Sequence, residues 1–501
     1  MIFTVISKKK FSKAFLAFNL VFLFSLMLFT LILSFLYSSR PLLSLIVISW
    51  QAGTFLIFYL RRISPSASNP LYLIFSILYL IYFMVPVSFY PIYSVINIYL
   101  GSSMSYFSQS YLTPDYPALL VLAVSSSLLL ISSSYTQSIK LISAKGRSRL
   151  NSFLSYLSSD SLFFVCIIAS FASIVSSLFF TRGLNQLLLS ELLNLFFFDI
   201  TIVSISLAWI YFALDGHLYP SRLRLPVLRG VSFLCLFILL PGLIGGSKGT
   251  VLLLITRLLL PLFSLPYILS LDFIIVPATS TSLLLACLAP FFFILGDYFR
   301  YQFIFAYKQI YYSDLRNLDI TSLAVLVIDR LSAELNNAYL LTEKALGTFL
   351  GPSLVNISHA IKTSINLILP GTYFDGFSMN TSNLLLDFFT HNVFYPVFYD
   401  SRQSMIDSLN TQPTTIFGDS VIYFGSLGFL LIPFCPFIFS YFFSFFGRLG
   451  FFGPALLFPT ASCLFLISYG VDTGLKVATL FIFSLFTLTL VLYSFSFLKK
   501  S

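Results

Sequence analysis

Charged residues are scarce in this chain. Only 9% of its 501 residues are Asp, Glu, Lys or Arg, whereas 58% are hydrophobic, and the mean hydropathy is +0.95. Soluble globular domains carry about 25% charged residues. A chain so poor in charge cannot cover a surface that faces water. The composition therefore excludes a soluble globular protein and predicts an all-α polytopic integral membrane protein.

Cysteine and histidine are also rare. The chain has five Cys and three His, with no Cys-x-x-Cys pair, no Asp-x-Asp pair and no group of His and carboxylates at ligand spacing. The cysteines lie in apolar runs, where they are typically small buried hydrophobic residues. We therefore expect no disulfide framework, no metal site and no cofactor.

The chain is nevertheless basic, with a formal net charge of +10. Its basic residues form short clusters between hydrophobic runs, which is typical of cytoplasmic membrane loops. The pattern therefore indicates the lipid bilayer, and no nucleic acid, as the partner of these charges.

Hydrophobic runs of about the 20 residues that a helix needs to cross a bilayer follow one another along the chain. The first, Ala14–Tyr37, follows Lys8, Lys9, Lys10 and Lys13 and is too long for a cleavable signal, so we expect it to remain as a span. We expect about twelve spans, near residues 14–37, 41–60, 71–92, 116–134, 161–180, 191–213, 228–245, 249–271, 274–295, 417–446, 451–470 and 477–497.

The basic clusters fall on alternate connections between these runs. With a cytoplasmic N-terminus, the even-numbered connections carry the clusters, for example Arg61 with Arg62, and the final Lys499 and Lys500 lie on the same side. The opposite connections carry only isolated cations such as Arg182. Because basic loops stay in the cytoplasm, we predict that both termini are cytoplasmic.

One long stretch, Asp297–Thr415, is not continuous membrane-spanning sequence. It holds ten of the 18 acidic residues, seven of the 28 basic residues and two of the three histidines. The predicted orientation places it outside the cytoplasm. It divides the chain into residues 1–296 with about nine spans, the large loop 297–415, and residues 416–501 with about three. Any chemistry is expected to use this loop.

Two parts of the loop have apolar residues at helical spacing. Ile320–Leu346 is the longer, and Gly347 with the following Gly-Pro pair is expected to end it. The second part is Ser353–Leu369. Helices of this kind have one apolar face. The sequence therefore predicts a cap of amphipathic helices that lie on the membrane surface.

Charged side chains on these two helices have both a functional and a structural interpretation. Arg330 stands in an otherwise apolar helix, where a charge is costly unless it is paired or in use. It can form an i,i+4 salt bridge with Glu334, which is the commoner explanation. His359 and Lys362 share a polar face of the second helix, and such a face is most often simply solvated.

The segment Gly245–Thr250 contains a Lys between glycines at the outer end of a predicted span. Glycines let the backbone approach a ligand, and a cation there can meet phosphate at the membrane interface. The structural alternative is a tight helical hairpin in which Lys248 extends to the headgroups. On the sequence alone, that alternative has the greater weight.

A second motif, Pro413–Gly428, enters a predicted span from the large loop. Gly418, Gly425 and Gly428 are expected to allow close helix packing. Asp419 is a carboxylate near the membrane boundary, where ionisable groups are candidates for function. It could equally cap the start of the helix, where negative charge is favoured.

These two motifs resemble elements of the bacterial oligosaccharide repeat-unit polymerases, the Wzy-type O-antigen polymerases. The Gly-Ser-Lys-Gly step around Lys248 is similar to a Gly-Ser-Arg-Gly element of that family. The glycine-rich entry to the helix after the large loop is similar as well. The family would have Arg at 248, Glu at 419 and often Asn next to Phe424. Charge is kept at the first two positions, but Lys248 cannot make the bidentate phosphate contact of an Arg.

The resemblance implies a membrane glycosyltransferase of the bacterial cytoplasmic (inner) membrane. Its substrate would be oligosaccharide repeat units on undecaprenyl diphosphate, polymerised into O-antigen or a related surface polysaccharide at the periplasmic face without a metal. A chain-length regulator is a candidate partner. The architecture that carries the resemblance covers nearly the whole chain, whereas the motifs cover some twenty residues.

Such a reaction needs cations that stabilise the diphosphate leaving group and an acceptor for the proton of the attacking hydroxyl. We predict two sets of residues for these roles. The candidate catalytic residues are Arg330, His359, Asp419 and Glu334. The candidate substrate-binding residues are Lys248, Arg300, Arg316, Lys362, Arg402 and His391. The general base stays open among His359, Asp419 and Glu334.

Three other functions were weighed. An O-antigen ligase, which passes the glycan to lipid A core, has a similar architecture and could use His359 or His391. A flippase or transporter should show paired repeats and broken helices near the midplane, and no half-to-half similarity is present. A polyprenyl-phosphate sugar transferase would have acidic residues in its first outer loop, and the short Tyr37–Leu42 connection has none.

Overall fold

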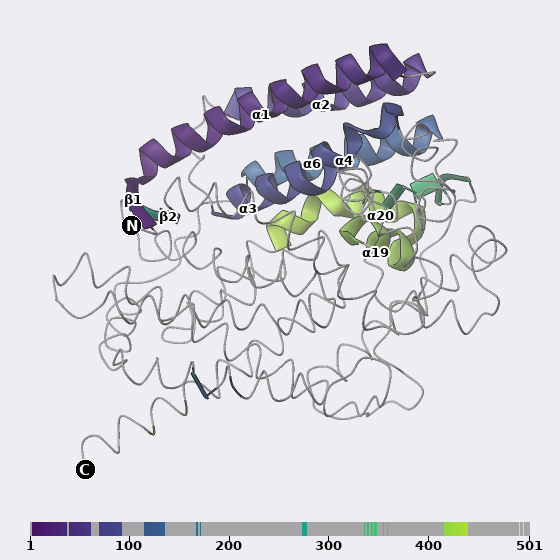
Figure 1. Cartoon of the computed structure of the whole chain (residues 1–501). Helices are drawn as coiled ribbons and strands as arrows, with labels where there is room; N and C mark the ends of the chain where they lie inside the picture. Colours follow the sequence, from purple (N-terminus) through teal and green to yellow (C-terminus); the bar gives the residue numbers. More distant parts are fainter. Residues whose placement is uncertain are drawn as a thin grey trace.

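The computed structural model describes residues 3–37, 40–61, 70–92, 115–135, 273–277 and 415–438, together with scattered helical positions between 167 and 494. This part of the chain is almost entirely helical (Figure 1). Four of its helical segments are long and apolar enough to cross a membrane, in agreement with the first four predicted spans. They are α1 (Lys8–Tyr37), α2 (Pro41–Arg61), the segment Phe75–Ile92 and α6 (Tyr116–Tyr135).

Helices α1 and α2 pack side by side and in opposite directions, because only a short connection separates them. Pro41 is the first residue of α2, where its missing N–H costs no hydrogen bond. The buried side chain of Gln51 donates to Thr30 Oγ1 of α1 at 2.9 Å and to Ser88 Oγ at 2.8 Å. These bonds tie three helical segments together in a region that is otherwise apolar.

The third segment changes its helical geometry along its length. It begins as α3 (Pro70–Tyr79), continues as the π-helical η1 (Leu80–Met84) and α4 (Val85–Val87), and ends in the 3₁₀ turn η2 (Tyr90–Ile92). Pro86 and Pro91 cannot donate backbone hydrogen bonds, so regular α-helix is not maintained through this end. Extra-wide turns of this kind are rare inside α-helices and are often found near functional sites.

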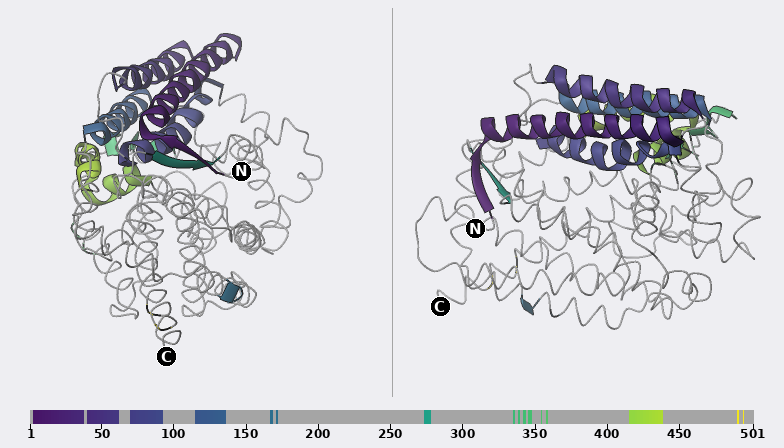
Figure 2. Two further views of the ribbon diagram at one scale, coloured as in Figure 1. Left: turned by 90° about the vertical axis from the view of Figure 1, so that its left-hand side faces the viewer. Right: turned by 45° about the horizontal axis from the view of Figure 1, so that its top comes forward.

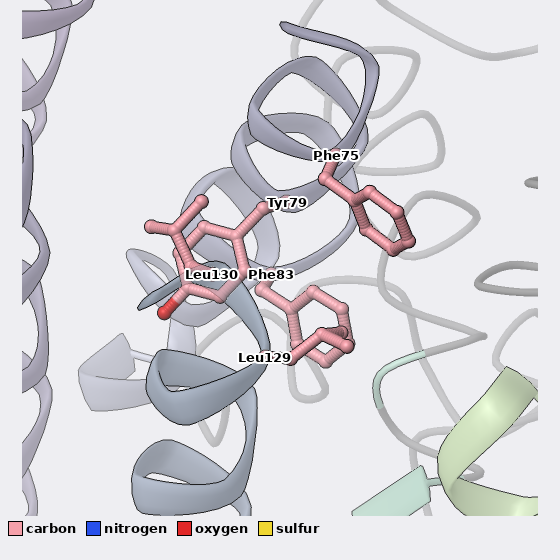
Figure 3. Close-up of a pocket in the computed structure, with 5 residues that line it drawn as sticks. All are labelled: Phe75, Tyr79, Phe83, Leu129 and Leu130. Carbon is pink, nitrogen blue, oxygen red and sulfur yellow. The ribbon is translucent and has the colours of Figure 1, made fainter. Parts of the chain in front are cut away.

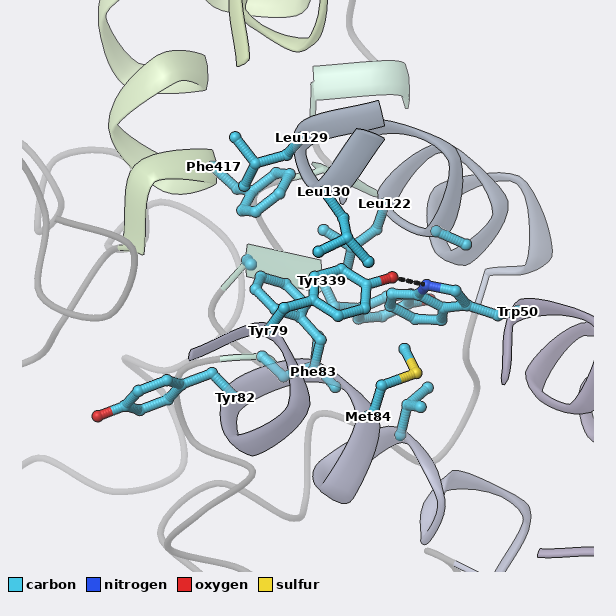
Figure 4. Close-up of a cluster of buried hydrophobic side chains, with 14 of the residues drawn as sticks. Trp50, Tyr79, Tyr82, Phe83, Met84, Leu122, Leu129, Leu130, Tyr339 and Phe417 are labelled. Atoms are coloured by element: carbon cyan, nitrogen blue, oxygen red, sulfur yellow. Dashed lines mark hydrogen bonds between the residues drawn. The ribbon is translucent and has the colours of Figure 1, made fainter. Parts of the chain in front are cut away.

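Aromatic side chains from several helices pack together in the core of the described region (Figure 4). Trp50 of α2 donates its indole N–H to the hydroxyl of Tyr79 at 2.7 Å, and Thr54 Oγ1 lies 3.2 Å from the same hydroxyl. The ring of Phe83 packs edge-on against Phe417, with centroids 5.2 Å apart. A buried Tyr or Trp normally needs a partner for its polar atom, and this core provides one.

Two short strands depart from the predicted all-helical architecture. β1 (Phe3–Ser7) pairs antiparallel with β2 (Phe273–Pro277), with Ser7 opposite Phe273. Residues 273–277 were expected to begin the ninth span at 274. They contain β-branched residues next to a Pro, which suits an extended segment more than a helix start. Eight predicted spans separate β1 from β2 in the sequence. Because an even number of crossings returns a chain to the side where it started, the pairing of the two strands is compatible with eight spans between them.

The predicted span 417–446 is not one continuous helix. α19 (Thr415–Phe424) is followed by η5 (Gly425–Leu427), α20 (Gly428–Leu431) and η6 (Ile432–Phe434). Gly425 has a φ of 60°, a left-handed conformation that a residue without Cβ adopts at little cost. The chain therefore reverses at Gly425, and α20 packs back against α19 (Figure 1).

Several other predicted spans lie wholly or largely outside the described residues. This holds for residues 191–213, 228–245, 249–271 and 451–470. The runs 161–180 and 477–497 are helical at their few described positions.

Candidate functional site

Most of the predicted site residues lie outside the described part of the chain. This applies to Arg330, His359 and Glu334 among the candidate catalytic residues, and to all of the candidate substrate-binding residues, Lys248, Arg300, Arg316, Lys362, Arg402 and His391. Asp419 lies within α19, as its fifth residue. Counted from Thr415, the first turn of α19 contains no acidic residue, and both interpretations of Asp419 stay predictions.

The predicted close approach of glycines in the Pro413–Gly428 motif is confirmed at Gly428. A Cβ atom there would lie 2.2 Å from the Ser420 carbonyl oxygen and 3.0 Å from the Val421 nitrogen. Contacts this short do not occur for real Cβ atoms, so only glycine fits between α20 and α19. The glycines allow one helix to fold back on itself, rather than two separate spans to pack.

A helix from the predicted outer loop packs against this break. The described positions between Leu335 and Gly347 are helical, and they fall on the predicted helix 320–346 and the glycine that follows it. Ser426, one residue beyond the reversal, donates its hydroxyl to the Ala345 carbonyl at 2.7 Å. Segments 81 positions apart in sequence are thus joined at the break.

One face of this loop helix is deeply buried. Leu335, Ala338, Tyr339, Thr342 and Ala345 are each at most 1% exposed and lie at spacings of three and four residues. All of them except Thr342 belong to the hydrophobic core that also includes side chains of α3 and α6. The described positions therefore include a buried, mostly apolar face, and at these positions other parts of the protein cover it. The predicted location of the loop on the membrane surface stays a prediction.

Tyr339 connects the loop helix to the start of α6. Its hydroxyl accepts a short hydrogen bond from the backbone N–H of Asp115 and lies 3.3 Å from the carbonyl of the same residue, to which it can donate. Its ring packs edge-on against Tyr90 of η2, with centroids 6.4 Å apart. Asp115 directly precedes α6, so Tyr339 holds three separate segments at one end of the bundle.

Glu343, one helical turn beyond Tyr339, has an unusual carboxyl group. Burial raises its pKa above the ordinary range, and the nearby Asp115 carboxylate raises it further, while a hydrogen bond with Tyr339 acts in the opposite direction. Burial, with the charge of Glu343, also raises the pKa of the Tyr339 hydroxyl, which therefore stays protonated. A half-buried carboxylate with a raised pKa is a stronger base than an ordinary exposed carboxylate, which makes it a candidate for proton transfer.

A crevice between two helices is lined by apolar side chains (Figure 3). Phe75, Tyr79 and Phe83 line one side, and Leu129 with Leu130 line the other. The Tyr79 hydroxyl is already bonded to Trp50. The crevice therefore offers little to recognise a polar substrate. Within the described ranges, no group of three or more His, Cys, Asp or Glu is placed to hold a metal ion.

No protein-family model, no curated protein and no solved structure matches this chain. The geometry of the described residues and the sequence motifs are therefore the basis for a functional proposal.

Asp115, Tyr339 and Glu343 are not among the site residues predicted from the sequence. The i,i+4 spacing of Tyr339 and Glu343 on a predicted helix is visible in the sequence and was the available signal. The contact with Asp115 joins residues 224 positions apart, which no periodicity predicts.

Proposed function

We propose that this protein is a membrane glycosyltransferase that joins lipid-linked oligosaccharide repeat units into a surface polysaccharide. The observation that carries the proposal is the contact between the glycine break at Gly425–Gly428 and the helix of the predicted outer loop, through Ser426 and Ala345. The motif that resembles the repeat-unit polymerases thus meets the segment in which the resemblance implies the chemistry.

The proposed arrangement in the membrane has about twelve spans, with both termini in the cytoplasm and the loop 297–415 in the periplasm. The pairing of β1 with β2 supports it, because eight crossings would place Ser7 and Phe273 on the same side. The break in the helix after the loop is also in keeping with a site. Irregular backbone at membrane depth is tolerated only where protein or a water-filled cavity surrounds it.

In the proposed reaction, a sugar hydroxyl of one lipid-linked unit attacks the anomeric carbon of the glycan on another. The new glycosidic C–O bond forms, the bond between the anomeric carbon and the diphosphate oxygen breaks, and undecaprenyl diphosphate leaves. The hydroxyl proton passes to a carboxylate or imidazole. Cations such as Lys248 and Arg330 would stabilise the charge that develops on the diphosphate.

Glu343 is the described residue best suited to accept that proton. It lies in the helix whose Ala345 carbonyl accepts a hydrogen bond from Ser426 of the glycine break, and its pKa is raised by burial and by Asp115. Asp419 belongs to the same motif and stays a candidate, as do His359 and Glu334. A base works best when its pKa lies near the operating pH, which favours Glu343 over an ordinary surface carboxylate.

The test is the glycan profile of the source cell after the gene is deleted and then restored. The proposal predicts that deletion converts a ladder of long chains into single capped repeat units, and that the intact gene restores the ladder. Long chains that stay on their lipid carrier would instead identify a ligase. Unpolymerised units that accumulate on the cytoplasmic side would identify a flippase, and either result would contradict the proposal.

Restoration with single variants then ranks the site residues. Glu343→Gln, Arg330→Ala, Lys248→Ala and His359→Ala are expected to shorten the ladder. Gly53→Ala is the matched control, because Gly53 lies in α2 and an added methyl group there meets nothing within 4 Å.

A further inference from the structure

The N-terminal end of α1 begins at a defined residue. Ser7 is the last residue of β1, and its Oγ accepts a hydrogen bond from the backbone N–H of Lys10 at 3.4 Å. This is the contact of a helix-capping serine with the third residue of its helix. Ser7 is also paired with Phe273 of β2, so the strand pair fixes its position as well. The first turn of α1 is therefore held in place.

Three exposed lysines form one basic face at this end. Lys9, Lys10 and Lys13 are exposed, and Lys13 follows the other two at spacings of four and three residues, so all three lie on one side of α1. Positive charge is unfavourable near the N-terminus of a helix, and the first turn of α1 contains no acidic residue. A nearby anion would offset this repulsion.

The basic face points in the same direction as the apolar surface of α1 that faces outward. Continuing from Lys13 at helical spacing, the side chains of Val21, Phe24 and Leu28 are 66%, 61% and 51% exposed. Helix α1 lies beside α2 at the edge of the group of described helices (Figure 2). In a membrane, lipid covers such a surface. Among the described residues no helix covers this side of α1, so we infer that the lysines face the lipid headgroups.

The length of α1 places the lysines at the depth of those headgroups. Its apolar part, Ala14–Tyr37, is about 36 Å long at about 1.5 Å per residue, whereas the hydrocarbon core is roughly 30 Å thick. Lys13 thus lies at the edge of the hydrocarbon, and Lys9 and Lys10 lie about 5 Å farther out. The headgroup layer on each side of a bilayer is about that thick.

We propose that Lys9, Lys10 and Lys13 form a binding surface for the phosphate groups of anionic phospholipids around the N-terminal end of α1. The lipid holds this end of α1 and the attached β1–β2 pair at the membrane interface. The inference does not depend on the proposed glycan reaction, because it uses none of the residues of that site.

The test measures lipid binding to the purified full-length protein in detergent. Short-chain phosphatidylglycerol and phosphatidylcholine are titrated separately, and bound lipid is counted by native mass spectrometry. The triple variant Lys9→Gln, Lys10→Gln and Lys13→Gln is compared with a triple Lys→Arg variant that keeps the charge. Each cation near an anionic surface contributes about a fivefold change in affinity, so the Gln variant should bind phosphatidylglycerol on the order of 100-fold more weakly.

The expected result is that the wild type and the Arg variant prefer phosphatidylglycerol and that the Gln variant loses this preference. Equal phosphatidylglycerol binding by the Gln variant and the wild type overturns the proposal. So does a wild type that binds both lipids equally. Inorganic phosphate is tested alone, and if it displaces phosphatidylglycerol at equal concentration, the surface binds a soluble anion instead. Should the triple Gln variant aggregate, Lys13→Gln alone should still show about a fivefold loss.

Discussion

Gly428 packs directly against the backbone of Ser420, and a methyl group at Gly428 would lie 2.2 Å from the Ser420 carbonyl oxygen. The contact joins residues of α20 and α19 that a continuous helix would hold two turns apart. It exists because the chain reverses at Gly425, where φ is 60°. The glycines of the motif therefore shape a tight fold-back next to the loop helix.

Gly428→Ala should destabilise the protein. The clashing atoms belong to the backbone and cannot rotate away, so we expect a cost of about 1–3 kcal/mol from overpacking. Thermal unfolding in detergent measures it. Gly53→Ala is the control, since its methyl group meets nothing within 4 Å and alanine in a helix interior should stabilise by about 0.5–1 kcal/mol. Equal effects of the two variants would show that α20 does not pack on α19 in this way.

Tyr339→Phe should loosen the attachment of the loop helix to α6. The change removes the hydroxyl that bonds to Asp115 but keeps the ring against Tyr90. The Asp115 N–H is partly buried, and leaving such a group without its partner costs about 1 kcal/mol. Tyr59→Phe in α2 is the matched control, because its side chain is 47% exposed. We expect a lower melting temperature for Tyr339→Phe only. A shift of the same size in both variants would argue against the Asp115 contact.

Glu343→Gln should make stability less dependent on pH. Burial and Asp115 raise the pKa of Glu343 in the folded protein, so the folded state favours the protonated carboxyl. That contribution is fully present below the pKa of the unfolded chain and is lost as pH rises through the raised folded pKa. The variant should therefore melt at a higher temperature than the wild type at neutral pH, and the difference should vanish toward about pH 4. A difference that does not change between these two pH values contradicts the raised pKa.

A disulfide can test the strand pair between the N-terminus and residues 273–277. Ser7 and Phe273 lie opposite each other, so Ser7→Cys with Phe273→Cys should cross-link when membranes are treated with an oxidant. The background is a variant without the five native cysteines. Val5→Cys with Phe273→Cys is the control, because Val5 lies opposite Ile275 and is out of register. Equal cross-linking of both pairs, or of neither, would refute the observed register.

The sequence predicted the helices of the described region better than it predicted their interruptions. The first four spans follow from apolar runs of bilayer length, which only helices satisfy in lipid. Gly425 and Gly428 were singled out from the sequence as sites of close packing. The same glycine spacing is compatible with packing between two helices and with a reversal within one helix, so the sequence does not distinguish them. The strand at 273–277 was missed because a short apolar β-branched run also suits the start of a span.

Of the residues predicted for the site, the structure describes only Asp419. Asp419 and the glycine motif were singled out from their types and from their place after the large loop. Tyr339 and Glu343 lie on a helix that was predicted, yet nothing local distinguishes them from other residues of that helix. Their importance comes from the contact with Asp115, which lies 224 positions away. Such contacts depend on how the helices pack, which the apolar periodicity of a sequence does not predict.

Polymerisation by the purified protein is the most direct test of the proposed function. Full-length protein in vesicles is mixed with undecaprenyl-diphosphate-linked repeat units extracted from a strain that lacks the gene, and product length is followed over time. The account predicts a ladder of longer lipid-linked glycans with release of undecaprenyl diphosphate, slowed by Glu343→Gln and kept by Gly53→Ala. If the protein is correctly folded and the repeat units nevertheless stay unpolymerised, the result would contradict the proposed function.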